Sequence, residues 1–377
     1  MDSHSDGGKT LFIFITKAGE LRSIFDKFEK MSTDIESVKD EVLIYCLNDQ
    51  LRIRKTTVES EIDIGLSISN RVGAGSIIVP FSPLNRVLKS YDSNSEIQFS
   101  LTRPTNRTMV WTLMSEGIKI CGYGHRPRRR PEKLKKESDW NTIENWNLFA
   151  RSLQSVLPFV SKDEARIQLS GIFLNSHWLC ATNGHILTKE KSNIEFHGFI
   201  LPENFARILC SVEGQIAMWR IVKKEQDSPV SIAFFINDQF YQTELIDAEY
   251  PDYNRVIPEK SICCVTLNRS DMLFALRKLI PITQPLDHQV TWHVDQKSRL
   301  CVKDKDTETT GEIPISGSHS GEKITIGIDY LYALTLLESL SSDRVTAKFT
   351  SPYSPIVWTD EEDNSGRLRL LMPIKLD

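Results

Sequence analysis

Residues 245–258 read LIDAEYPDYNRVIP, a short passage with two prolines, two tyrosines and three acidic residues. Pro251 fixes its own φ angle and pushes the preceding Glu249 and Tyr250 towards extended geometry, so the passage is predicted to be stiff. A stiff segment at the edge of a binding site loses little conformational entropy when a ligand arrives. The passage also separates two blocks of sequence that share one pattern of helices and strands, and it therefore marks where one folding unit ends.

The same order of elements is indicated three times along the chain. Each block contains a helical pattern, several strand-like runs, a second helix and three closing strands. The first helices of the three blocks are AGELRSIFDKFEKM, WNLFARSLQSVL (146–157) and SDMLFALRKLI (270–280). Most strands are separated by only a few polar residues, which favours antiparallel hairpins. The sequence therefore predicts an α+β fold of three repeated domains, each with two helices packed on antiparallel sheets.

The predicted domain boundaries follow from this repeat. We assign residues 1–125 to a first domain, 126–140 to a basic linker, 141–258 to a second domain and 259–377 to a third. GAGS at 73–76 has no following Lys-Ser or Lys-Thr, so we interpret it as a turn rather than a phosphate-binding loop.

Local periodicity predicts which faces are buried. The apolar face of the first helix is formed by Leu21, Ile24, Phe25 and Phe28. In the strand QLRIRKT, alternation places Leu51, Ile53 and Lys55 on one side of the sheet and Arg52, Arg54 and Thr56 on the other.

The composition is that of a soluble globular protein. The 377 residues are 40% hydrophobic and 25% charged, and the formal net charge is −4, so any contact with nucleic acid must be local or loose. The N-terminal MDSHSDGGKT lacks a signal-peptide layout and no apolar run is long enough to span a membrane, which favours the cytoplasm. The seven cysteines are scattered and none has zinc-ligand spacing, so no disulfide framework, metal or cofactor is expected.

Three passages in the second and third blocks match motifs of a known family. They are SKDEARIQLSGIFLN followed by LCATNGHILT, then LIDAEYPDYNRVIP, and finally LLMPIKLD at the chain end. They resemble T-D-E-T-R-x-x-L-N-G, A-T-D-G-H-R-L, I-D-G-x-F-P-D-Y-x-R-V-I-P and M-P-M-R-L of the bacterial sliding clamp, the β subunit of DNA polymerase III. The resemblance covers the middle and last thirds well. The first third keeps the order of helices and strands but few of the family's sequence motifs, which indicates a diverged first domain.

The resemblance implies a head-to-tail homodimer that closes into a ring around double-stranded DNA, whose sequence it does not read. Such a ring is a processivity factor rather than an enzyme. It tethers DNA polymerase, other replication and repair proteins and the clamp loader through short peptide motifs that bind one pocket in each chain. The alternative is a clamp-like scaffold that binds peptides but has lost or altered its encirclement of DNA. An enzyme is the other rival class, but the sequence supplies no nucleophile or metal partner for Asp247, Glu249 and Asp252.

The family's peptide pocket lies between the middle and last domains. Carried over residue by residue, the wall from the middle domain is predicted to consist of Leu169, Thr182, Gly184, His185, Leu187, Pro251, Arg255 and Val256. The last domain is predicted to add Tyr353, Pro355, Leu370, Met372, Pro373 and Ile374. Apolar groups of this kind bury a partner's leucine or phenylalanine, while a few polar groups fix its orientation. Taken alone, TNGH is better explained as an Asn-Gly turn between two strands, and the pocket interpretation depends on the presence of the other two motifs.

The chain departs from the family's motifs at four positions. Asn183 stands where the family has Asp, Ile186 where it usually has Arg, Lys375 replaces an Arg, and Asp377 extends the end. Loss of a guanidinium removes a bidentate donor and a stacking surface, so we expect a pocket with an altered peptide preference.

Basic side chains on the predicted helices are the candidates for facing DNA. They are Arg22, Lys27, Arg86, Lys89, Arg151, Arg207, Arg277 and Lys278, and the resemblance adds Lys162 and Arg166 from a loop. Contacts of this kind with phosphates are independent of base sequence and sensitive to salt. For any single helix arginine, a solvated surface is an equally good interpretation.

Two further features concern the linker and the ring closure. The run HRPRRRPEKLKK (125–136) is either an additional contact with DNA or the loader, or simply a solvated linker. The apolar strand GIKICGYG would otherwise be an exposed edge, so we expect a dimer interface formed by Ile118, Ile120, Ile280 and Ile282.

Overall fold

A computed structural model describes most of the chain. The described residues are 9–31, 40–47, 50–66, 68, 70–103, 109–129, 131, 139–222, 230–283, 288–304, 306–361, 363 and 365–376. Arg130 and residues 132–138 of the predicted linker lie outside this set, as does the terminal Asp377.

The chain forms two compact units. Unit 1 contains residues 1–147 and 207–245, and unit 2 contains residues 148–206 and 246–377. All strand pairings among the described residues are antiparallel, and helices pack on the sheets, so the predicted α+β class is confirmed. The division between the units passes through the middle third, and the three-domain assignment stays a prediction. Among the described residues, no helix is long and apolar enough to cross a membrane.

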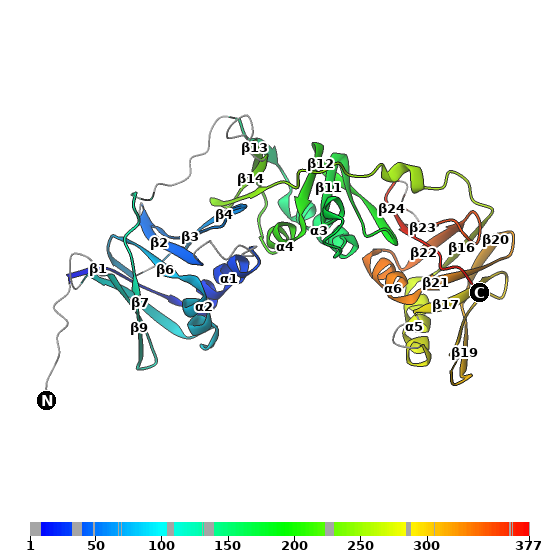
Figure 1. Ribbon diagram of the computed structural model, residues 1–377, viewed down its shortest axis with the longest axis horizontal. Helices are drawn as coiled ribbons and strands as arrows, with labels where there is room; N and C mark the ends of the chain where they lie inside the picture. The colour runs from blue at the N-terminus through cyan, green and yellow to red at the C-terminus, as the bar shows by residue number, and fades with distance from the viewer. Residues whose placement is uncertain are drawn as a thin grey trace. The chain divides into compact units, whose positions relative to one another are not determined.

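Unit 1 contains two sheets (Figure 1). The five-stranded sheet has the order β5(Asn70–Gly73), β1(Lys9–Lys17), β7(Glu96–Arg103), β8(Met109–Ser115) and β9(Ile118–Gly124). The eight-stranded sheet has the order β10(Asn141–Ile143), β13(Ala217–Val222), β14(Ser231–Ile236), β15(Gln239–Glu244), β4(Ser60–Leu66), β3(Gln50–Thr56), β2(Glu41–Leu47) and β6(Ser76–Pro80). The pairing of β15 with β4 joins strands from the middle and first thirds of the sequence in one sheet.

Unit 2 repeats this arrangement with strands of the middle and last thirds. Its seven-stranded sheet has the order β11(Gly171–Thr182), β12(Ile186–Pro202), β24(Leu368–Leu371), β23(Ile356–Asp360), β22(Arg344–Phe349), β16(Cys263–Asn268) and β20(Gly317–Gly321). A four-stranded sheet has the order β19(Thr310–Pro314), β18(Arg299–Lys303), β17(Gln289–Val294) and β21(Ile324–Asp329). Here the pairing of β12 with β24 joins the two thirds.

Each third contributes two α-helices. They are α1(Ala18–Glu29), α2(Phe81–Lys89), α3(Trp146–Val156), α4(Glu203–Cys210), α5(Arg269–Leu279) and α6(Tyr330–Ser339), with 3₁₀ turns η1(Leu157–Phe159), η2(Ile167–Leu169), η3(Tyr253–Val256) and η4(Ile280–Ile282). The predicted apolar face of α1 is buried, and its Phe25 ring stacks on Phe81 of α2 at a centroid distance of 5.4 Å. Helix α2 begins at Phe81, and Pro83 lies within its first turn, where a proline is tolerated.

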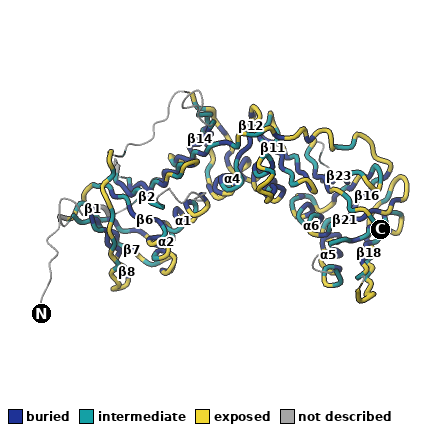
Figure 2. The backbone as a smooth tube through the Cα atoms, in the orientation of Figure 1, coloured by how far each residue is buried: buried dark blue, intermediate teal, exposed yellow. Residues whose placement is uncertain are grey.

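Burial follows the strands, while the hairpin turns are exposed (Figure 2). The predicted alternation of β3 is correct for Leu51 and Ile53, but Arg52 on the other side is also buried, at 2% exposure. Charge is therefore buried in the sheet of unit 1, which side-chain alternation alone does not predict.

Three short strands, β5, β10 and β20, have few apolar residues, so they form because a neighbouring strand offers hydrogen-bonding partners. The much longer β11 contains a register shift near Ser176 and stays paired with β12 on both sides of it.

Candidate functional site

The turn between β11 and β12 is fixed by its own side chains. The Asn183 Oδ1 atom accepts hydrogen bonds from the backbone N–H groups of His185 and Ile186, both at 2.9 Å. The Thr182 hydroxyl donates to the Ile186 carbonyl at 2.7 Å, and Gly184 adopts a φ of 92°, which favours glycine. Asn therefore supplies the acceptor oxygen that an Asp would supply at this position, without its negative charge.

A cluster of buried apolar residues lies next to this turn. Its described members are Leu169, Cys180, Leu187, Ile200, Tyr250, Tyr253 and Leu370. Leu187 of β12 lies opposite Leu370 of β24 in the joining strand pair. The cluster therefore depends on strands from both the middle and last thirds.

The segment 245–258 covers one side of this cluster. The Tyr250 ring stacks on Phe173 with 4.6 Å between centroids and an interplanar angle of 2°. Asp252 caps the turn η3 by accepting from the backbone of Asn254, and it forms an ion pair with Arg255 at 3.1 Å. Burial raises the pKa of Tyr253 to about 12 and that of Tyr250 well above its usual value. Both phenols therefore stay neutral and act as packing groups.

The C-terminal tail is held on two sides. The Met372 N–H donates to the His185 carbonyl at 2.8 Å, and the Ile374 N–H donates to the Gly327 carbonyl at 2.8 Å. A Cβ atom at Gly327 would lie 2.6 Å from the Ile374 carbonyl oxygen, so a side chain there would displace the tail. The His185 ring stacks on Tyr332 of α6 at 5.1 Å.

The predicted pocket residues fall into three groups. Leu169, Leu187 and Leu370 are core residues of the cluster. Partly buried or exposed residues next to them form the turn and the tail: Thr182, Gly184, His185, Met372, Pro373 and Ile374. The remaining residues lie on the segments that flank the cluster, where Ile257 and Val357 pack against it: Pro251, Arg255, Val256, Tyr353 and Pro355.

Several residues that build this region were not predicted as part of it. Tyr250 and Tyr253 belong to the quoted passage, and their aromatic character was the available signal. Tyr332 and Phe173 gave no such signal because their contacts with His185 and Tyr250 arise only on folding.

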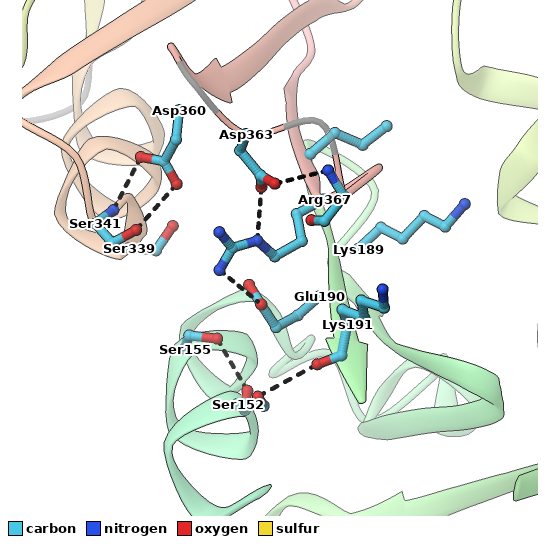
Figure 3. Close-up of polar contacts among 12 residues, drawn as sticks. Ser152, Ser155, Lys189, Glu190, Lys191, Ser339, Ser341, Asp360, Asp363 and Arg367 are labelled. Carbon is cyan, nitrogen blue, oxygen red and sulfur yellow. Dashed lines mark hydrogen bonds and ion pairs between the residues drawn. The ribbon is translucent and has the colours of Figure 1, made fainter. Parts of the chain in front are cut away.

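A buried ion network lies beside the same strand pair. Glu190 of β12 forms ion pairs with Arg369 at 2.7 Å and with Arg367 at 3.5 Å. Arg367 lies between the carboxyl groups of Glu190 and Asp363 (Figure 3). Arg369 is 3% exposed and also donates to the Ser339 hydroxyl, so its charge is compensated inside the protein.

Most of the predicted DNA-facing cations have partners within their own unit. Lys89 of α2 pairs with Glu29 of α1 at 2.7 Å, and Arg277 of α5 pairs with Glu338 of α6 at 2.7 Å. Arg22 donates to the Tyr91 carbonyl, Lys27 to the Ser23 carbonyl, Lys162 pairs with Glu203, Arg166 pairs with Asp163, and Lys278 lies over the Phe274 ring.

The other predicted DNA-facing cations are Arg207, Arg86 and Arg151. Arg207 is exposed on α4. Arg86 and Arg151 are exposed and form no ion pair with another described residue.

The predicted dimer residues lie near free sheet edges. Strand β9, which carries Ile118 and Ile120, is the last strand of the five-stranded sheet, and β19 is the last strand of the four-stranded sheet. Ile118 is 53% exposed. Ile280 and Ile282 form the turn η4 and are partly exposed.

Comparison with known proteins gives one consistent result. The family of the DNA polymerase III beta subunit, C-terminal domain, matches residues 254–375. A beta sliding clamp of Buchnera aphidicola is 21% identical, over 90% of this chain and 92% of its own length. The crystal structure of a sliding clamp from Bartonella birtlesii, bound to griselimycin, is 21% identical, covers 97% of this chain and 100% of that chain, and has a TM-score of 0.81.

The resemblance to the bacterial sliding clamps is confirmed. A clamp from Thermotoga maritima is similar to the same extent, with 20% identity, 97% coverage of this chain, 100% coverage of that chain and a TM-score of 0.79. Because these structures cover nearly the whole chain, the first third has the clamp fold although its sequence has diverged. No group of three or more His, Cys, Asp or Glu side chains suited to a metal occurs in the part of the chain that the structure describes.

Proposed function

We propose that this protein is a DNA sliding clamp, a processivity factor that encircles duplex DNA and tethers DNA polymerase and other replication and repair proteins. The observation that carries the proposal is the clamp fold over nearly the whole chain, including the diverged first third. The proposal includes a cytoplasmic location, three domains in each chain and two chains in each ring. It requires no catalytic group and no cofactor.

The helix charges support loose contact with DNA. Exposed cations on α2 and α5 are each neutralised by a glutamate on the neighbouring helix, at Glu29 and Glu338. Their attraction for phosphates is reduced, since a nearby carboxylate offsets most of the field. Arg86 and Arg151, which form no ion pair with another described residue, supply most of the remaining attraction for the duplex without gripping it. A ring that slides is retained by its topology rather than by affinity.

The cluster next to the Thr182–Ile186 turn supports peptide binding. Leucines and tyrosines underlie the site, while exposed Pro251, Val256, Tyr353 and Met372 lie on the segments around it. This arrangement suits a short segment with a leucine or phenylalanine anchor. We propose that DNA polymerase and the clamp loader bind here through such segments. Asn183 and Ile186 carry no charge where the family's motif has Asp and Arg, and Ile186 is buried at 2% exposure, so the peptide preference of this site is proposed to differ from that of the family.

The free edges of β9 and β19 support a head-to-tail homodimer. Each is the terminal strand of its sheet, so each has backbone groups available for pairing with another chain. The exposed Ile118 lies on one edge strand. Pairing of β9 of one copy with β19 of another would be used twice in a closed dimer.

Retention on DNA of defined topology tests the proposal. The purified protein is loaded onto nicked circular DNA, with its loader, and the bound fraction is measured before and after linearisation. We expect retention on the circle and rapid loss from the linear form, because only a closed ring depends on free ends to escape. A chain that binds peptides but is never retained on circles would instead be the clamp-like scaffold, the less favoured alternative. A monomeric mass in solution would also contradict the proposal.

A further inference from the structure

A cavity of about 630 Å³ lies in unit 1, beside the start of the basic segment. It is lined by Tyr45 of β2, by the turn before β6 and by residues of the segment 126–131. The segment is anchored because His125 and Ile78 exchange two backbone hydrogen bonds, at 2.9 and 3.0 Å. Pro127 and Pro131 restrict the chain beyond this anchor. One side of the cavity is therefore the eight-stranded sheet, and the other is an irregular segment whose conformation is restricted by its anchor and by its prolines.

Three arginines line this cavity. Arg126, Arg128 and Arg129 are exposed, and none of them forms an ion pair with another described residue. No aspartate or glutamate is among the described residues that line it. The chain as a whole has a net charge of −4, so this concentration of positive charge is a local feature.

Two acidic residues described close to this region, Asp63 and Glu41, already have partners. Asp63 accepts from the Tyr45 hydroxyl at 2.6 Å and from Arg52 and Arg54 at 3.0 and 2.7 Å. Glu41 lies 3.7 Å from the His125 ring. Neither carboxylate is among the lining residues, so the three arginines keep their charge for a ligand.

Phosphate fits this set of donors better than a carboxylate does. One guanidinium fork satisfies the two oxygens and single charge of a carboxylate, whereas a phosphate group has further oxygens and charge for additional arginines. The cavity volume is in the range of small-ligand sites. Ser76 and Tyr45 are also among the lining residues.

We propose that this cavity binds phosphate groups, through Arg126, Arg128 and Arg129. The phosphate comes either from a free phosphorylated small molecule or from the backbone of a single-stranded nucleic acid. The site belongs to unit 1 alone and does not depend on ring closure or on the peptide site. Its function would be separate from the contacts that a sliding ring makes with duplex DNA.

The test compares three sets of substitutions in the full chain. The first is R126Q/R128Q/R129Q, and the second is R126K/R128K/R129K, which keeps the charge but removes the planar fork. The control is K297Q/K323Q/K348Q, which makes the same change in net charge at exposed positions of unit 2. Unchanged thermal midpoints establish that each variant folds, as expected for exposed side chains.

The first probe is inorganic pyrophosphate, measured by isothermal titration calorimetry. We expect the arginine-to-glutamine variant to bind about tenfold more weakly or worse, the lysine variant to lie between it and the parent, and the control to be unchanged. The second probe is labelled oligothymidylate, measured by anisotropy at several salt concentrations. If nucleic acid is the source of the phosphate, the slope of log binding constant against log salt concentration becomes less steep by about 2 in the glutamine variant. Each lost phosphate contact removes about 0.7 from that slope.

Each outcome decides the proposal. Displacement of oligothymidylate by pyrophosphate assigns the site to nucleic acid, and pyrophosphate binding without oligothymidylate binding assigns it to a free phosphorylated ligand. The proposal of phosphate binding would be overturned if the lysine control K297Q/K323Q/K348Q weakened probe binding as much as the arginine variant does. It would also be overturned if an oligoglutamate peptide bound more tightly than either phosphate probe. Failure of retention on circular DNA leaves these results unaffected, so the two proposals fail separately.

Discussion

The two units join strands of neighbouring thirds in the same way but place different side chains at the joint. In unit 2, β12 pairs with β24 and brings Leu187 opposite Leu370. In unit 1, β4 pairs with β15 and brings Glu61 opposite Gln242. Both pairings are antiparallel, so the same backbone hydrogen-bonding pattern joins the two thirds of the sequence in each unit. Unit 1 also has an apolar pair at this position, Ile62 opposite Tyr241, but it places the buried Asp63 carboxylate opposite Phe240, whereas unit 2 places buried Arg369 opposite Thr188.

This difference indicates how one repeated architecture supports two kinds of binding. The leucines and tyrosines of unit 2 exclude water and fit an apolar anchor of a peptide. Unit 1 has Asp63 and Arg52 buried and Arg54 partly buried near its joint, and a cavity lined by arginines and Tyr45. Both units bury an ion cluster, and the following experiments ask whether those clusters are equivalent.

Removal of the Asp63 carboxylate is expected to have the largest effect. In Asp63→Ala, Arg52 stays buried at 2% exposure without its ion-pair partner, so we expect a loss of about 3–5 kcal/mol of stability in unit 1. Calorimetric unfolding measures the loss, and hydrogen exchange in β2, β3 and β4 localises it. Glu61→Ala is the control, because Glu61 lies on β4 like Asp63 and also pairs with Arg54, but it is more exposed than Asp63. Equal effects of the two substitutions would show that burial of the pair is unimportant.

The corresponding change in unit 2 is expected to be smaller. In Glu190→Ala, Arg369 keeps hydrogen bonds to the Ser339 hydroxyl and the Leu368 carbonyl, much as Arg52 keeps two backbone partners in Asp63→Ala. The Glu190 side chain is 9% exposed whereas that of Asp63 is fully buried, so we expect the smaller loss of about 1–3 kcal/mol. The same calorimetric experiment measures it, with exposed Glu195 of β12 changed to Ala as the control. A loss as large as that of Asp63→Ala would make the two clusters equivalent and remove this part of the comparison.

Truncation of Tyr353 is expected to separate peptide binding from stability. The side chain is 73% exposed, so Tyr353→Ala should leave the unfolding midpoint unchanged while weakening peptide binding by about 1–2 kcal/mol, roughly 5- to 30-fold. Fluorescence polarisation with a labelled peptide that carries a Leu-Phe pair measures the affinity. Tyr123→Ala is a matched control, because Tyr123 is 74% exposed in unit 1. A similar loss in both variants would argue against a peptide site in unit 2.

The smallest effect concerns alkaline pH. Burial, with the neighbouring Asp63 carboxylate, raises the pKa of Tyr45 to about 12. A raised pKa stabilises the fold fully below the ordinary value of 10, and this contribution is lost as the pH rises towards 12. Tyr45→Phe should therefore lose less stability over that interval than the parent does. Thermal midpoints of the parent and of Tyr45→Phe, measured at pH values on both sides of 10, test this. If the difference in midpoint between the two proteins is the same on both sides of pH 10, the prediction is contradicted.

Periodicity and motifs made much of the architecture predictable. The buried face of α1, the helix pairs and most strands follow from the spacing of apolar residues, because that spacing reports which side of an element meets the core. The Asn-Gly turn and the passage 245–258 were identified by residue types with restricted backbone geometry. The short strands β10 and β20 were not, since they contain little apolar signal and depend on a partner strand.

The sequence by itself determined the repeated α+β pattern, the local turns and the resemblance to sliding clamps, because each depends on residues close together along the chain. Only the tertiary structure decided that Arg52 and Arg369 are buried with carboxylates, that His185 stacks on Tyr332, and that three arginines line one cavity. The Arg369 and His185 contacts join residues distant in sequence, and the cavity places the arginines beside Tyr45 and the turn before β6. The energies of these contacts depend on burial and on the partners present, and neither quantity is fixed until the strands have paired.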